Sequence, residues 1–161
     1  RSTSTNASTN ERIPALIDSC PSDGIRWFLK HVFNKEYQIL EARNGQDGID
    51  VALKEEPDLI LCDVMMPVKD GYETCREIKS DPKMAQTPVV MLTAKVESED
   101  VITGIEAGAD DYITQPFDVE ILRSKINSLM KKLFYVRYYL LLPNEMSQYS
   151  VFGTNNMKSA D

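Results

Sequence analysis

Short apolar runs alternate with amphipathic stretches along the middle of this chain. The run at residues 59–62 shows no alternation with polar residues, which is typical of a strand buried on both faces of a parallel sheet. Four other short runs predict strands, and five longer stretches place apolar residues at helical spacing. The strands are expected at 15–17, 37–42, 59–62, 89–92 and 112–114, and the helices at 25–33, 49–53, 72–78, 97–107 and 119–140.

The order of these elements predicts the fold class. A strand followed by a helix, five times over, is typical of an α/β domain with a parallel sheet. Right-handed crossovers arrange five such strands as a doubly wound, flavodoxin-like sheet with helices on both faces. In the fourth helix the spacing directs Val101, Ile102 and Ile105 inward, and Gly108 is expected to end that helix as its C-cap.

Asp63 is the first candidate for chemistry, because it directly follows the apolar run at 59–62. Ligands of open α/β sheets bind outside the carboxyl ends of the strands. Pro67 and Gly71 then break the chain before the next helical pattern. A single aspartate at a strand end more often caps a loop than takes part in chemistry. A functional role for Asp63 therefore needs further evidence from the neighbouring sequence.

That support comes from motifs that follow one another in order and with regular spacing. They are Asp63, Met65-Met66-Pro67 and Gly71, then residues 89–94, residues 108–114 and Pro116-Phe117. Together they resemble the receiver domain of bacterial response regulators, over roughly residues 12–133. The resemblance implies the CheY-like form of the fold, with strand order 2-1-3-4-5, and a cis peptide bond before Pro116.

The resemblance also implies a chemistry. In receivers a phosphoryl group passes from a phosphohistidine of a histidine kinase or phosphotransfer domain to an aspartate, which is the nucleophile. Asp63 matches the phosphoacceptor, Thr93 the hydroxyl switch and Tyr112 the aromatic switch. Such a domain catalyses only its own phosphorylation and dephosphorylation. Taken singly, Thr93 also fits a strand-end hydroxyl bonded to the backbone, and Tyr112 a core aromatic.

Receivers also hold Mg²⁺, a hard ion that takes oxygen ligands. The resemblance assigns Asp63, the backbone carbonyl of Met65 and an acidic pair after the first strand. Counting forward from that strand puts Asp18 in the first acidic place and Ser19 in the second. Counting back from the first helix without a gap puts no carboxylate there. Both registers stay open, and Mg²⁺ is expected to bind weakly or not at all.

A second departure from the receiver pattern is Gln115, which stands in the usual lysine place. Glutamine donates a hydrogen bond but brings no positive charge. One alternative is therefore a degenerate receiver that only binds partner proteins, through its fourth helix, fifth strand and last helix.

An enzymatic alternative comes from Cys20 and Arg26, which have the Cys-x5-Arg spacing of tyrosine-phosphatase phosphate loops. The pattern is short, and no Ser or Thr follows Arg26. The Asp81-Pro82 pair lies in mid-chain, not in a late general-acid loop. We rank this hypothesis below the receiver.

The two ends of the chain differ from its middle. Residues 1–11 are small and polar, which predicts a disordered linker that follows another module, as in a hybrid two-component protein. Residues 12–133 are expected to form the receiver domain, and 134–161 an extension of the last helix with a weakly structured tail. Heptad spacing through that helix predicts a homodimer. The positions are Val119, Leu122, Ile126, Leu129, Leu133, Val136 and Leu140.

Composition and net charge bear on the partners and the location of the protein. The net charge of −7 argues against a nucleic-acid surface. No apolar run is long enough to span a membrane. The three cysteines lack paired metal-ligand spacing and fit a reducing cytosol, so a cytoplasmic domain is expected.

Overall fold

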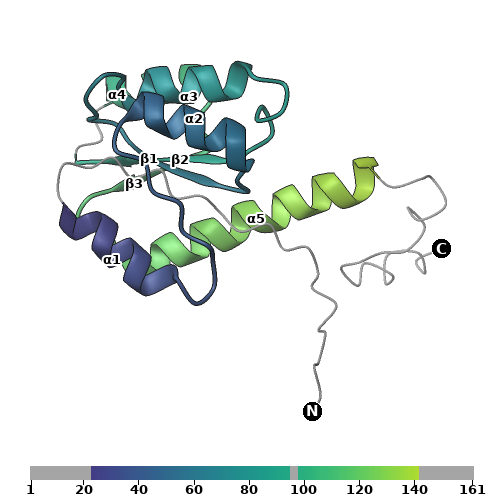
Figure 1. Ribbon diagram of the computed structural model, residues 1–161, viewed down its shortest axis with the longest axis horizontal. Helices are drawn as coiled ribbons and strands as arrows, with labels where there is room; N and C mark the ends of the chain where they lie inside the picture. The colour runs from purple at the N-terminus through teal and green to yellow at the C-terminus, as the bar shows by residue number, and fades with distance from the viewer. Residues whose placement is uncertain (1–22, 95–97, 142–161) are drawn as a thin grey trace, which may run out of the picture.

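The computed structural model describes residues 23–94 and 98–141 of the 161-residue chain, and these residues form one parallel sheet with helices on both faces (Figure 1). The strands are β1 (Ile60–Asp63), β2 (Val89–Thr93) and β3 (Asp111–Thr114), which lie in the order β1-β2-β3. The helices are α1 (Asp23–Phe33), α2 (Gly45–Glu55), α3 (Gly71–Ser80), α4 (Ser98–Ala107) and α5 (Val119–Leu141). The α/β class predicted from the sequence is confirmed.

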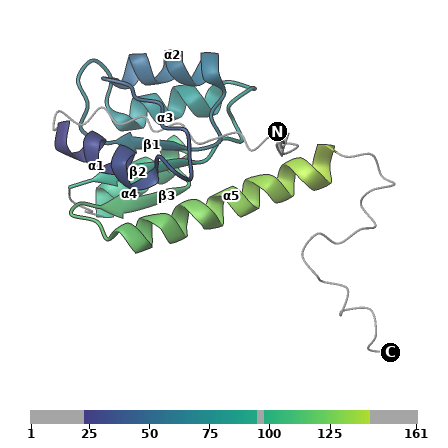
Figure 2. The ribbon, with the colours of Figure 1, turned by 60° about the horizontal axis from the view of Figure 1, so that its bottom comes forward.

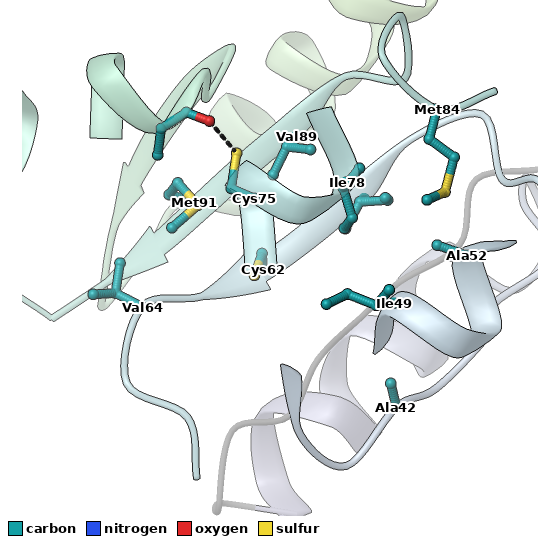
Figure 3. Packing of buried hydrophobic residues seen from close by; sticks show 12 residues of the cluster. Ala42, Ile49, Ala52, Cys62, Val64, Cys75, Ile78, Met84, Val89 and Met91 are labelled. Carbon is teal, nitrogen blue, oxygen red and sulfur yellow. Dashed lines mark hydrogen bonds between the residues drawn. The ribbon is translucent and has the colours of Figure 1, made fainter. Parts of the chain in front are cut away.

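Alternate strand residues point to opposite faces of the sheet and so build two apolar cores. Ile60 and Cys62 face the core covered by α2, α3 and α4, whereas Leu61 faces the core covered by α1 and α5. Figure 3 shows the first core, where Cys75 and Ile78 of α3 lie over the strands. Every residue of β1 and β2 is buried, as their unbroken apolar runs predict.

One predicted strand is absent from the described residues. The segment 37–42 has no strand assignment. A strand is defined by its hydrogen-bonded neighbour, and the neighbour predicted for this segment, residues 15–17, lies outside the described part of the chain. The order β1-β2-β3 agrees with the last three strands of the order 2-1-3-4-5.

The phase predicted for α4 is wrong. Ile102 and Ile105 were expected to point inward, but they are 56% and 65% exposed, while Gly104 and Ala107 are buried. The inner face of α4 thus carries small residues, and at Gly104 this leaves room for the side chain of Tyr112 from β3. When the buried face of a helix carries small residues, the spacing of large apolar residues predicts the exposed face to be the buried one.

The end of α4 follows the prediction. Gly108 has φ of +89°, its N–H donates to the carbonyl of Ile105, and the N–H of Ala109 donates to that of Gly104, both at 3.0 Å. This is the Schellman arrangement, which requires a left-handed residue after the helix.

A polar network then fixes the start of β3 against β2. The backbone N–H of Asp110 donates to the carbonyl of Val89, and its Oδ2 accepts from the N–H of Val89 at 2.8 Å. Lys79 Nζ of α3 donates to the same Oδ2 at 2.8 Å and to the carbonyl of Thr87 at 2.7 Å. These bonds give the N–H and carbonyl of Val89 and the carbonyl of Thr87 partners where β2 begins, which helps to fix the register of β3 against β2.

The last helix, α5, covers the second core and then continues beyond it. Leu122, Ile126 and Leu129 pack in that core, and Leu133 is also buried. From there the helix runs to Leu141, and in Figures 1 and 2 this end extends away from the sheet. In the described ranges no helix combines the length and apolar character needed to cross a membrane.

Candidate functional site

Asp63 ends β1 and is held in place by its own loop. Its side chain is 6% exposed, and Oδ1 accepts a hydrogen bond from the backbone N–H of Met65 at 2.8 Å. The N–H of Val64 donates to the carbonyl of Leu92, so the sheet bonding continues one residue past the strand. The carboxylate therefore sits at the carboxyl edge of the sheet on a rigid backbone.

The loop after Asp63 is tightly folded. The N–H of Lys69 donates to the carbonyl of Pro67 at 2.8 Å, which closes a γ-turn around Val68 with φ of +70°. Positive φ is unusual for a β-branched residue and marks a strained turn. The N–H of Gly71 returns to the carbonyl of Val64 at 2.9 Å, so the loop folds back against the end of β1.

Thr93 lies at the carboxyl end of the neighbouring strand, β2. Asp63 pairs with Leu92, so Thr93 lies one residue further toward the same edge of the sheet. Its side chain is 6% exposed. Its carbonyl accepts a hydrogen bond from the N–H of Gln115 at 2.7 Å, which ties the end of β3 to the end of β2.

Gln115 brings a buried donor to this edge. The peptide bond to Pro116 is cis, as the resemblance implies. The side-chain Nε2 is buried, and it has no hydrogen-bond partner among the residues that the structure describes. A buried donor left without an acceptor costs about 1–3 kcal/mol. This amide is therefore a buried donor with hydrogen-bonding capacity to spare next to the end of β2.

Tyr112 lies on β3 but turns toward α4. Its hydroxyl donates to the backbone carbonyl of Asp100 at 3.3 Å, and the hydroxyl of Tyr72 from α3 donates to the same oxygen at 3.3 Å. Burial, with a smaller contribution from the nearby Tyr72 phenol, raises the pKa of Tyr112 to about 12. Burial also raises the pKa of Cys75, to about 11.

The structure brings four of the predicted site residues to one edge: Asp63, Met65, Thr93 and Gln115. Asp18, Ser19 and Cys20 lie outside the described residues, while Arg26 lies on α1. In the described ranges no group of three or more His, Cys, Asp or Glu residues could hold a metal ion. Of the predicted metal ligands, these ranges contain the Asp63 carboxylate and the Met65 carbonyl.

Two residues of this region were not identified by the sequence analysis. The spacing of apolar residues places Tyr72 on the inner face of α3 and predicts no further role for it, and it predicts no role for Gly104. A glycine inside a helix costs about 1 kcal/mol relative to alanine, so its presence asks for a packing reason. That signal could have identified Gly104.

Comparison with known proteins identifies the family. The family model for the response regulator receiver domain matches residues 21–127. A probable transcriptional regulator, ycf27 of Porphyra purpurea, is 40% identical over 108 residues, which cover 67% of this chain and 43% of that protein. The chain thus spans less than half of the length of this curated relative.

Solved structures agree with this assignment. The signal receiver domain of a signal transduction histidine kinase from Syntrophus aciditrophicus is 34% identical, with a TM-score of 0.68, covering 75% of this chain and 91% of that one. The receiver domain of sensor histidine kinase PA1611 from Pseudomonas aeruginosa has the same fold at 24% identity, with a TM-score of 0.68, covering 74% and 98%. That structure has a magnesium ion coordinated in its active-site cleft. With its CheY-like fold and this family match, the chain belongs to the response regulator receiver domain family and is a signalling module of two-component systems, not an enzyme in the usual sense.

Proposed function

We propose that Asp63 accepts a phosphoryl group from a phosphohistidine of a histidine kinase or phosphotransfer domain, in the cytoplasm. The observation that carries this proposal is the placement of Asp63. Its buried carboxylate ends β1, and Thr93 lies one residue beyond its level on the adjacent strand. A nucleophile and a hydroxyl are thereby held on rigid elements at the edge where α/β sheets bind ligands.

The transfer follows from this placement. An oxygen of Asp63 attacks phosphorus, the P–N bond breaks, and the electron pair stays on the imidazole nitrogen of the donor. Negative charge spreads over the phosphoryl oxygens during transfer, so positioning and donors matter most. Thr93 and the Nε2 of Gln115 are the donors that we assign to these oxygens. Tyr112 is the aromatic that we expect to respond.

Substitution of Asp63 tests the proposal. Incubation with acetyl phosphate should add one phosphoryl group to the wild-type chain, read by intact mass, and none to Asp63→Asn, because an amide is not a nucleophile here. Asp50→Asn is the matched control, since Asp50 lies exposed on α2 and should not matter. If the wild type stays unmodified, the degenerate-receiver hypothesis is favoured. If Asp63→Asn is still modified, a residue other than Asp63 is the phosphoacceptor.

We also propose a weak Mg²⁺ site. The Asp63 carboxylate and the Met65 carbonyl are suitable oxygen ligands, and Asp18 is the further carboxylate that the longer-loop register offers. When bound, the ion supplies positive charge that offsets the charge of the phosphoryl group. The damaged acidic pair is the reason to expect low affinity.

Titration calorimetry with MgCl₂ checks this site without any phosphodonor. The wild type should show weak binding, and Asp18→Ala should abolish it, because one carboxylate alone binds the ion too loosely to detect. Asp50→Ala serves as the control and should titrate like the wild type. Absence of heat from every variant would favour the ungapped register, in which Cys20 and Pro21 occupy the acidic places.

Finally, we propose that the chain forms a homodimer through α5. Leu133 is the last residue of the helix described as buried, and Tyr135 beyond it is 49% exposed. The heptad spacing continues through Val136 and Leu140. An apolar seam on a helix that extends away from its own domain is commonly covered by a second helix.

Truncation after Leu133 checks the dimer. Light scattering should give a dimer for residues 1–161 and a monomer for residues 1–133, because the shorter chain lacks the second half of the seam. The double variant Val136→Glu, Leu140→Glu should also be monomeric, while its circular dichroism spectrum still shows a folded domain. A clean monomer for the full chain would show that the seam has no partner copy.

The phosphatase hypothesis has no support from the family to which the chain belongs. Cys20, the cysteine of the Cys-x5-Arg pattern, lies outside the described residues.

A further inference from the structure

The middle of α4 carries a notch that fits the ring of Tyr112. A Cβ placed on Gly104 would lie 0.8 Å from Oη of Tyr112 and 2.1 Å from its Cζ. Both distances are far shorter than any contact between atoms that are not bonded. No residue other than glycine can therefore occupy position 104 while Tyr112 keeps this position.

A shared acceptor lies beside the hydroxyl in this notch. The carbonyl oxygen of Asp100, one turn before Gly104 on α4, accepts from Tyr112 and Tyr72, each at 3.3 Å. Asp100 lies inside α4, where its carbonyl is also the acceptor for the helical N–H four residues on, so the two phenols donate long bonds to an oxygen that is already engaged. Three elements, α3, α4 and β3, therefore meet at one oxygen.

The two phenols remain donors under ordinary conditions. Burial is the first cause that raises the pKa of both rings, and for Tyr112 the value reaches about 12. Both hydroxyls thus keep their protons at neutral pH. Tyr72 and Tyr112 also pack against the same apolar core.

The glycine at this position faces inward. Gly104 is buried, whereas its neighbours Ile102 and Ile105 are exposed on the outer side of α4. A helix-interior glycine lowers helix stability. The atoms nearest to the missing side chain are the hydroxyl oxygen, Cζ and a ring carbon of Tyr112, so this ring occupies the space that a side chain would need.

We propose that Gly104 and Tyr72 are positioning residues for Tyr112. Gly104 supplies the space, and Tyr72 shares the Asp100 carbonyl and limits movement of the ring, so that the unphosphorylated domain holds Tyr112 against α4. This inference rests on the proposed function, in which Tyr112 responds to a phosphoryl group on Asp63. Release of the ring from α4 is then the step that phosphorylation must drive.

The position of the ring can be measured on the full chain without a phosphodonor. With ¹³C-labelled tyrosine, the wild type should show NOE cross-peaks between the Tyr112 ring and α4, and Gly104→Ala should lose them. Tyr72→Phe should weaken them. Gly24→Ala is the matched control, because a Cβ there meets nothing within 4 Å, and it should leave the cross-peaks unchanged. Retention of the cross-peaks in Gly104→Ala would overturn the proposal.

A double variant keeps the test decisive if Gly104→Ala folds poorly. If Gly104→Ala destabilises the domain only because the new methyl group collides with the Tyr112 ring, the drop in melting temperature should disappear in a Tyr112→Ala background. An equal drop in both backgrounds would show that Gly104 serves α4 itself, and the positioning role would be wrong.

Phosphorylation separates positioning from simple packing. With acetyl phosphate, the wild-type ring signals should change as Asp63 is modified, whereas Gly104→Ala, whose ring is already displaced, should reach a higher level of modification at limiting donor. Identical ring signals before and after modification of the wild type would refute the inference alone. A wild type that is never modified would refute the proposed function, and would leave Gly104 as a packing residue.

Discussion

Gln115→Lys should raise the rate of phosphorylation of Asp63 by about ten- to a hundredfold. A charge-assisted hydrogen bond contributes on the order of 1.5–3 kcal/mol, about twice a neutral one. The glutamine amide lies buried at the edge shared with Thr93 and offers a donor, but it brings no charge to the phosphoryl oxygens. A lysine ammonium at the same place adds that charge in the transition state, where it lowers the barrier.

The measurement is the time course of intact mass with acetyl phosphate at fixed concentration. Gln115→Met is the matched control, because methionine has a similar length and neither donor nor charge, and it should react more slowly than the wild type. An acidic residue restored at Ser19, as Ser19→Asp, should increase the rate of Gln115→Lys further. If the wild type reacts as fast as Gln115→Lys, the missing charge has no consequence in this chain.

Gly71→Ala should lower the free energy of unfolding by about 1–3 kcal/mol and slow the modification of Asp63. A Cβ on Gly71 would lie 2.3 Å from the backbone carbonyl oxygen of Asp63 and 2.8 Å from Cα of Val64. These are backbone atoms, which cannot rotate away as a side chain can. The substitution therefore forces apart the start of α3 and the end of β1, which carries the phosphoacceptor.

Urea unfolding followed by circular dichroism measures the first effect, and intact mass the second. Gly24→Ala is again the control and should stabilise the domain slightly, by about 0.5–1 kcal/mol, because it replaces a glycine of helix α1 where the new methyl group meets open space. Equal stabilities and equal rates for Gly71→Ala and the wild type would show that the loop yields without moving Asp63.

The strands and the phosphoacceptor could be predicted because both depend on local sequence. The apolar run at 59–62 lies within one residue of β1, and a strand end fixes where Asp63 must stand. The cis peptide bond before Pro116 came from the family resemblance and is present. These features need no knowledge of which distant residues meet.

Features that depend on packing between elements were not predictable in the same way. The inward face of α4 is small, and Ile102 and Ile105 are on the outside, because α4 accommodates a ring from β3. Tyr72 and Tyr112 both contact the Asp100 carbonyl, although Tyr72 is 28 residues and Tyr112 is 12 residues away from Asp100 in the sequence. No periodicity along one segment contains that information.

The order of the strands has a consequence for how the domain is made. β1, β2 and β3 follow one another along the chain and lie side by side in the same order, so each new strand can add to an edge that already exists as the chain leaves the ribosome. The core beneath α1 is different, because Leu122, Ile126 and Leu129 complete it only at the end. Until α5 has emerged, α1 alone covers that apolar face, and the part that α5 will cover is open to the solvent and to chaperones.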